Sequence, residues 1–239
     1  MNLSDEAVRP LQKMFLAVPP SYDFLNRLLT LRMDQLWRRR AARKMLQEPV
    51  DQILDLCTGT GDLAIMLRRL AAPSVKIHAL DYSTTMLKVA KMKISRQKQT
   101  QITLVQGDAA SMPFKDGYFD AVGIAFAFRN LTFKNPDRDR FLAEIRRVLK
   151  PCGRFVAVET SQPENRWIRG LYHGYMRFVT KPLGGRLSGH RGAYHYLAYS
   201  AIQYYRATEL RQILIEAGFS KVIYKPMLFG MAALWECHA

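Results

Sequence analysis

Short apolar segments alternate with helical segments along most of this 239-residue chain, and this alternation constrains the fold more than any other feature. Strands are predicted over 52–57, 75–80, 102–106, 119–128, 154–159, 222–225 and 231–236. Helices are predicted over 63–70, 83–96, 137–149 and 208–217. Because the connections are short and helices follow most strands, we predict an α/β fold with a doubly wound, mainly parallel sheet of seven strands.

Two parts of the chain lie outside this alternation. Helices are predicted over 5–16 and 21–47, with Pro19-Pro20 between them. The other part, between the fifth strand and the last helix, is unusually rich in aromatic residues. We predict one domain in four parts: an N-terminal helical cap (1–47), an α/β core (48–159), a helical lid insertion (160–207) and the C-terminal part of the core sheet (208–239).

Basic residues are concentrated in three segments, and the net charge of the chain is +16. Residues 9–44 carry nine basic and two acidic side chains, whereas 82–101 carry five basic and 165–208 seven basic side chains with no acid. Such segments can face phosphate, either of nucleic acid or of anionic lipid. The charge alone does not distinguish the two.

Several classes of protein are excluded by composition. The chain is 49% apolar and 23% charged, as in folded globular proteins. Its longest apolar run, Met227 to Trp235, is far too short to span a bilayer. The three cysteines, at 57, 152 and 237, have no metal-ligand spacing, and the first residues do not resemble a secretory signal. We therefore expect a cytoplasmic protein with free thiols and no metal site.

The first predicted strand ends at Asp55 and leads into a loop with Gly59 and Gly61. The spacing differs from the dinucleotide pattern G-x-G-x-x-G, and Asp62 at the start of the next helix would repel a phosphate. A cofactor that carries an ammonium and a sulfonium suits this acidic loop. Asp81, after the second strand, could accept both hydroxyls of a ribose, and Asp108, after the third, an exocyclic amine of adenine. These residue types indicate S-adenosylmethionine (SAM), although Asp62 and Asp81 could instead be helix caps.

Motifs along nearly the whole chain resemble those of a known enzyme family. They are Ser21-Tyr-Asp-Phe-Leu-Asn26, Asp34-Gln-Leu-Trp37, Leu54-Asp-Leu-Cys-Thr-Gly-Thr-Gly-Asp62, Asp81-Tyr-Ser-Thr-Thr-Met-Leu87, Gly107-Asp-Ala109, Met112-Pro-Phe114, Phe126-Ala-Phe-Arg-Asn130, Arg147-Val-Leu-Lys-Pro151 and Ala193-Tyr-His-Tyr-Leu197. The chain resembles the class I SAM-dependent methyltransferases, and among them the menaquinone and ubiquinone biosynthesis C-methyltransferases. The glycine loop is common to the whole class, whereas the first and seventh motifs are much narrower.

The resemblance implies a Rossmann-like fold, SAM as cofactor and a polyprenyl hydroquinone methylated on a ring carbon. The implied cofactor contacts are Asp55, Gly59, Thr60, Gly61, Asp81, Tyr82, Met86, Asp108, Ala109 and Ala125. Of these, the glycine loop would hold the methionine part, Asp81 the ribose, and Asp108 with Ala109 the adenine. Departures from the family pattern occur at Ala127, Phe128, Thr160, 189–191 and Tyr199, and they concern the substrate side.

Ring methylation requires an ionised hydroxyl beside the attacked carbon. A phenol has a pKa near 10, and a neighbouring cation would lower it. We predict that Arg129 supplies this cation, with Asn130 orienting it or the substrate, and that Tyr22, His190 or Tyr194 relays the proton. Arg129 could instead form a salt bridge that holds the sheet end together, and His190 could be a solvated loop residue.

The cap and the lid are predicted to close over an apolar tunnel for the prenyl tail, which aromatic side chains and Met176 would line. Their basic residues would face an anionic membrane surface, which makes the protein peripheral on the inner face of the cytoplasmic membrane; a solvated basic face is the alternative. Nucleic acid is not expected, because 127–130 read Ala-Phe-Arg-Asn where such enzymes often have Asn/Asp-Pro-Pro-Tyr/Phe. Several alternatives remain open. The acceptor could be another phenol or lipid, the protein could be a non-catalytic paralogue, and it could form a homodimer. The sequence does not distinguish menaquinone from ubiquinone as the product.

Overall fold

The computed structural model describes residues 22–98, 101–188 and 191–239. The helix predicted over 5–16 and the predicted relay residue His190 lie outside the described residues. Tyr22 begins the first described helix, but its side chain is likewise outside the description.

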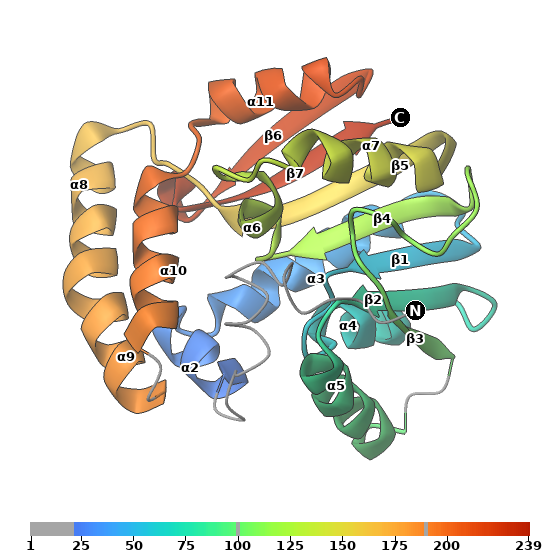
Figure 1. The fold of residues 1–239 in the computed structure, drawn as a ribbon, viewed down its shortest axis with the longest axis horizontal. Helices are drawn as coiled ribbons and strands as arrows, with labels where there is room; N and C mark the ends of the chain where they lie inside the picture. The colour runs from blue at the N-terminus through green and yellow to red at the C-terminus, as the bar shows by residue number, and fades with distance from the viewer. Residues whose placement is uncertain (1–21, 99–100, 189–190) are drawn as a thin grey trace.

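A seven-stranded sheet forms the centre of the molecule (Figure 1). Its strands, in spatial order, are β3 (Ile102–Gln106), β2 (Lys76–Asp81), β1 (Gln52–Leu56), β4 (Phe119–Ala125), β5 (Leu149–Thr160), β7 (Ala232–His238) and β6 (Lys221–Met227). All neighbouring pairs are parallel except those of β7, which is antiparallel to both β5 and β6. The predicted doubly wound, mainly parallel sheet is confirmed.

Helices cover both faces of this sheet, so the central strands are largely buried. On one face lie α3 (Met33–Met45) and α4 (Asp62–Leu70), and α5 (Thr84–Arg96) packs near α4 beside β2 and β3. On the other lie α6 (Phe128–Thr132), α7 (Arg138–Val148) and α11 (Ala207–Glu216). In β1 the four residues from Ile53 to Leu56 are all buried, as expected of a strand covered on both faces.

Three predicted boundaries are wrong. The helix predicted over 21–47 is two helices, α2 (Tyr22–Leu29) and α3, because Leu31 and Arg32 have left-handed backbone torsions, with φ of 50° and 63°. The fourth strand ends at Ala125, since Phe126 has a φ of 62° and α6 begins at Phe128. The fifth strand begins early, because Leu149 already pairs with Phe119 before a register shift.

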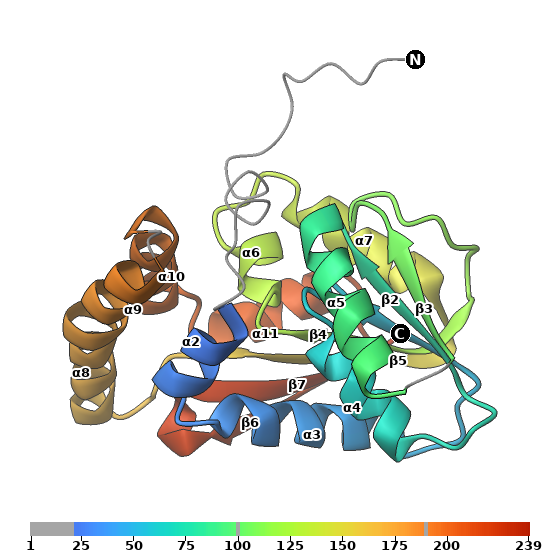
Figure 2. The ribbon, with the colours of Figure 1, turned by 90° about the horizontal axis from the view of Figure 1, so that it is seen from below.

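The segment predicted as a lid is helical and stands beside α2 at one end of the sheet (Figures 1 and 2). It consists of α8 (Arg166–Tyr175), the π-helical turn η2 (Met176–Thr180), α9 (Lys181–Ser188) and α10 (Arg191–Gln203). The hydroxyl of Tyr175 donates to the carbonyl of Leu29 at 2.6 Å, which ties the lid to α2. The remaining element, the short turn η3 (Leu228–Gly230), connects β6 and β7.

Candidate cofactor and substrate site

A cavity opens at the carboxyl ends of β1, β2, β3 and β4, on both sides of the point where the strand order reverses between β1 and β4. This is the position at which open α/β sheets bind ligands. The predicted cofactor residues that line it are Asp55, Gly59, Thr60, Asp81, Tyr82, Met86, Asp108, Ala109 and Ala125. Gly61, the remaining one, forms the N-cap of α4 one position beyond the lining.

The two glycines of the loop serve different purposes. Both have left-handed torsions, with φ of 57° at Gly59 and 83° at Gly61, which favour glycine. A Cβ at Gly59 would meet nothing within 4 Å, whereas a Cβ at Gly61 would lie 3.2 Å from Cβ of Ala90 on α5. Gly61 therefore permits the close packing of α5, and Gly59 leaves room for a ligand beside the backbone.

Asp81 and Asp55 hold the loop in shape. Asp81 accepts from the backbone N–H of Gly59 and of Ser83, both at 2.8 Å. Asp55 accepts from the hydroxyl of Thr58 at 2.5 Å and from the backbone N–H of Ala64 at 2.9 Å. The N-cap of α5 is Ser83, so Asp81 is not the cap of that helix.

Burial raises the pKa of both carboxyl groups above the usual range of an aspartic acid. For Asp55 the pKa is raised to about 7, because the group is withdrawn from water and its hydrogen bonds only partly offset this. Burial likewise raises the pKa of Asp81. A cation in the cavity would favour the ionised form of both groups, and this is the electrostatic property expected of a site for a sulfonium and an ammonium.

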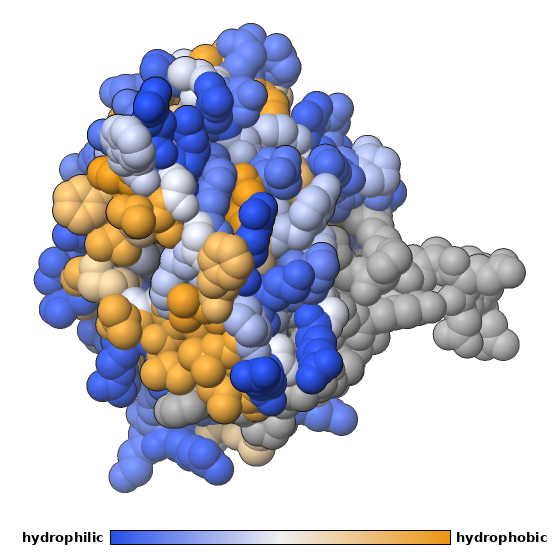
Figure 3. Space-filling view, turned by 90° about the vertical axis from the view of Figure 1, so that its left-hand side faces the viewer, coloured by the Kyte–Doolittle hydropathy of each residue, from blue (hydrophilic) through white to orange (hydrophobic). Residues whose placement is uncertain are grey.

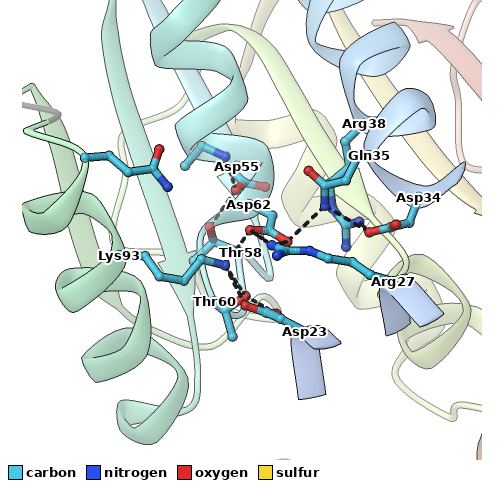
Figure 4. Close-up of polar contacts among 12 residues, drawn as sticks. Asp23, Arg27, Asp34, Gln35, Arg38, Asp55, Thr58, Thr60, Asp62 and Lys93 are labelled. Carbon is cyan, nitrogen blue, oxygen red and sulfur yellow. Dashed lines mark hydrogen bonds and ion pairs between the residues drawn. The ribbon is translucent and has the colours of Figure 1, made fainter. Parts of the chain in front are cut away.

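Helices α2 and α5 contribute an ion-pair network that the sequence analysis did not identify (Figure 4). The ammonium of Lys93 donates to Asp23 at 2.7 Å and to the hydroxyl of Thr60 at 3.1 Å, and it also pairs with Asp62. Arg27 of α2 approaches Asp62 at 3.4 Å. The network joins α2 and α5 to the glycine loop.

Asp62 illustrates the electrostatics of this network. Burial alone would raise the pKa of its carboxyl group, but the cations Lys93, Arg38 and Arg27 outweigh burial and lower it. A sequence signal for Lys93 did exist: with Met86 and Ala90 it lies at spacings of four and three residues, and so on one face of α5.

Beyond the acidic loop, the cavity wall becomes largely apolar. Phe126, Ala127, Leu131 and Phe141 line this part together with Asn130. The side-chain oxygen Oδ1 of Asn130 is buried and has no hydrogen-bond partner in the described part of the chain. A buried acceptor without a partner is costly, so this atom is available to a hydroxyl or amine of a ligand.

The other predicted catalytic residues are not gathered around the cavity. Arg129 is buried and not part of the lining; its guanidinium pairs with Glu159 at 3.2 Å and donates to the hydroxyl of Thr160 at 2.6 Å. Its backbone N–H also donates to Glu159, at 3.0 Å. Tyr194 is buried on α10, where it packs near Leu29. Of the described side chains in this set, only Asn130 faces the cavity.

Comparisons with known proteins agree with this geometry. The model of the ubiE/COQ5 methyltransferase family matches residues 1–238. A demethylmenaquinone methyltransferase of Thermus thermophilus is 41% identical over 92% of this chain and 97% of its own. The "ubiquinone/menaquinone biosynthesis C-methyltransferase UbiE" of Geobacter sulfurreducens is 35% identical over 94% of this chain and 86% of its own.

The chain belongs to the ubiE/COQ5 methyltransferase family. It is thus a SAM-dependent methyltransferase, as the sequence predicted. Solved structures are consistent in fold: a SAM-dependent methyltransferase of Aquifex aeolicus superposes with a TM-score of 0.61 at 19% identity, covering 95% of this chain and 96% of its own. Another, from Thermotoga maritima, has a TM-score of 0.62 at 17% identity, covering 95% and 98%.

Proposed function

We propose that this methyltransferase methylates a ring carbon of a polyprenyl hydroquinone in quinone biosynthesis. The observation that carries the proposal is a single cavity in which a loop rich in carboxylates adjoins an apolar wall with one buried acceptor, Asn130 Oδ1. The first part suits a cationic methyl donor and the second a largely apolar ring. The names of the relatives, demethylmenaquinone methyltransferase among them, support the same substrate class.

The cofactor contacts follow from the lining residues. We propose that Gly59 and Thr60 lie against the methionine part of SAM, Asp81 against the ribose, and Asp108 with Ala109 against the adenine. When bound, SAM supplies an electrophilic methyl group. The carboxylates of the cavity hold its positive end, and Asp81, fixed by Gly59 and Ser83, keeps lone pairs for hydroxyl groups.

The acceptor must be ionised next to the attacked carbon, and this is the step that the chain has to assist. We propose that Asn130 orients the ring through its free Oδ1. Arg129 remains the predicted cation that lowers the pKa of the acceptor hydroxyl. Its pairing with Glu159 and Thr160 favours a second role, in which it fixes α6 and thereby Asn130.

The reaction is tested with purified protein, SAM and a short-chain demethylmenaquinol, with mass spectrometry of the product. We expect one added methyl group, located on the ring carbon by fragmentation. A ubiquinol precursor assayed in parallel separates the two quinone classes. Methylation on oxygen, or methylation of simple phenols but of neither quinol, would overturn the proposal in favour of another small acceptor.

We also propose that the outer face of the lid docks on an anionic membrane, where a prenylated substrate resides. Trp167, Leu171 and Phe178 are 71–73% exposed, and Figure 3 shows apolar residues gathered on this side of the molecule. Exposed basic residues lie among them, at Arg166, Arg177, Lys181 and Arg186. This arrangement matches the amphipathic surface of peripheral proteins. Within the described chain, no helix is long and apolar enough to cross a bilayer.

Vesicle flotation tests the docking face without substrate. We expect binding to vesicles with anionic lipid, loss of binding at high salt, and loss on combining Trp167→Ser with Phe178→Ser. If the protein is a monomer and does not bind vesicles with anionic lipid, membrane docking is refuted. A dimer that the double variant dissociates, with no response to lipid, would assign the face to a second copy of the chain.

A further inference from the structure

The charges that line the cavity are strongly unequal. Five carboxylates line it, from Asp23, Asp55, Asp62, Asp81 and Asp108. Among the lining residues of the described chain, Arg38 is the single Arg or Lys. SAM carries two positive groups and one carboxylate. The positive groups have several partners here, whereas the carboxylate would be repelled nearly everywhere in the cavity except close to Arg38.

The guanidinium of Arg38 is fixed before any ligand arrives. It pairs with Asp34 one helical turn earlier, at 2.6 Å, and its side chain is 12% exposed. Its Cζ lies 4.9 Å from the ring centroid of Phe126, the residue with a left-handed backbone after β4. Asp34 is itself held by Thr30 at 3.0 Å and by Gln35 at 3.0 Å. A cation held this way loses little conformational entropy on binding.

Arg38 is also close to the part of the site that would hold the methionine moiety. Its charge acts on both Asp55 and Asp62, which flank the glycine loop. Gln35, on the same helix, donates to Asp62 at 3.3 Å and to Asp34, and so connects α3 to the loop (Figure 4). Two other cations lie nearby, and both are engaged. Lys93 contacts Asp23, Asp62 and Thr60, and Arg27 contacts Asp62.

We propose that Arg38 binds the carboxylate of the methionine part of SAM. The inference rests on the proposed cofactor site and adds a residue that the sequence analysis did not assign. The carboxylate would share the guanidinium with Asp34, as the planar fork of arginine allows. Arg38 would thus set the position of the amino-acid end, while Asp81 sets that of the ribose.

The test compares two ligands that differ only in this carboxylate. Calorimetry would measure the binding of SAM and of decarboxylated SAM to the wild type and to Arg38→Ala. A lost charge-assisted contact predicts about ten- to one-hundredfold weaker binding of SAM by the variant. Binding of decarboxylated SAM should change by less than about threefold. Arg39→Ala, an exposed neighbour on α3, is the matched control and should bind both ligands like the wild type.

Each other outcome has a defined meaning. Equal losses for both ligands would show that Arg38 acts through the fold, and would overturn the proposal. Unchanged SAM affinity in Arg38→Ala would do the same, and a selective loss in Lys93→Ala instead would assign the carboxylate to Lys93. If the wild type bound neither ligand, the cofactor site itself would be refuted, which separates that failure from a failure of Arg38 alone.

Discussion

The glycine-loop end of the sheet and the outer face of the lid both carry many charges, but the burial and pairing of these charges differ. Around the loop the charges are buried or half-buried and paired at short range, as in Lys93 with Asp23 and Asp62. On the lid, Arg177, Lys181 and Arg186 are exposed, and 165–208 contain no acid at all. Paired buried charges fix a shape for a small ligand, whereas unopposed exposed charges attract a surface over a longer range.

The same contrast extends to apolar side chains. The aromatic residues of the lid were predicted to line a tunnel, but Trp167 and Phe178 point outward, and Tyr172 and Met176 pack within the lid itself. In the described structure, the cavity lining includes no residue of 160–207. The buried site and the exposed face should therefore respond differently to substitution.

The largest effect is expected for the buried pair at the base of α6. In Arg129→Ala, the Glu159 carboxylate, whose side chain is fully buried, would lose its cation. Removing one partner of a buried pair costs about 3–5 kcal/mol, so the free energy of unfolding should fall by this amount. Turnover should also fall steeply, while SAM affinity stays within about threefold. Urea unfolding, steady-state assays and calorimetry measure the three quantities.

A matched variant distinguishes the two roles of Arg129. If the guanidinium contacts the acceptor hydroxyl, Arg129→Ala should shift the pH dependence of kcat upward, because the phenol loses a nearby cation, and Glu159→Gln should not. If the pair only holds α6, both variants should lose turnover alike, with no shift of the profile. Wild-type turnover in Arg129→Ala would contradict both roles.

The next largest effect concerns the cofactor loop. Asp81→Ala removes the acceptor of two backbone hydrogen bonds and the proposed partner of the ribose. In the variant, both ribose hydroxyls would lose a hydrogen bond to the charged carboxylate. Two such bonds contribute about 3 kcal/mol or more, so SAM affinity should fall at least about one-hundredfold. Calorimetry checks the loss, with Asp81→Asn as an isosteric control that retains one acceptor. Unchanged affinity in Asp81→Ala would contradict the assignment of the ribose.

The sequence predicted the residues at the strand ends of the cofactor site better than those on the neighbouring helices. Asp55, Gly59 and Asp81 follow strands directly, and parallel strands bring their carboxyl ends together without further information. Arg38 lines the same cavity, and Lys93 contacts carboxylates of its wall, only because α3 and α5 pack beside the loop. The helical pattern indicates which faces of these helices are buried, but not what they face.

The positions of the residues on the substrate side of the cavity depend on backbone torsions that an apolar sequence pattern does not predict. The run 119–128 reads as one buried strand, yet Phe126 adopts a φ of 62° and ends it. A non-glycine residue rarely occupies that region, so no propensity predicts it. Arg129, two positions into the next helix, consequently turns toward Glu159 instead of continuing along the strand edge.

A smaller effect should appear in the pH dependence of stability. Burial raises the pKa of Asp55 from 3.8 to about 7, so the folded protein binds a proton that the unfolded chain has released. This contribution is present below pH 4 and is lost as the pH rises through 7. Between pH 6 and pH 8 the free energy of unfolding should fall by about 1 kcal/mol. Denaturant titrations would measure the fall, which Asp55→Asn should abolish; an equal fall in that variant would assign it to other groups.

The smallest effect belongs to single charges of the lid. Each basic residue near an anionic membrane contributes about 1 kcal/mol, so Arg177→Gln should weaken vesicle binding about fivefold. Its side chain is exposed, so the free energy of unfolding should change by less than about 0.5 kcal/mol. Lys221→Gln, exposed on β6 and outside the lid, serves as the control with the same change of charge. Equal weakening in both variants would mean that net charge, and not the lid, governs membrane binding. If only Arg177→Gln weakens vesicle binding, and does so at low but not at high salt, the lid makes the electrostatic contact with the membrane. The buried charges of the loop would then act on the cofactor and not on the membrane.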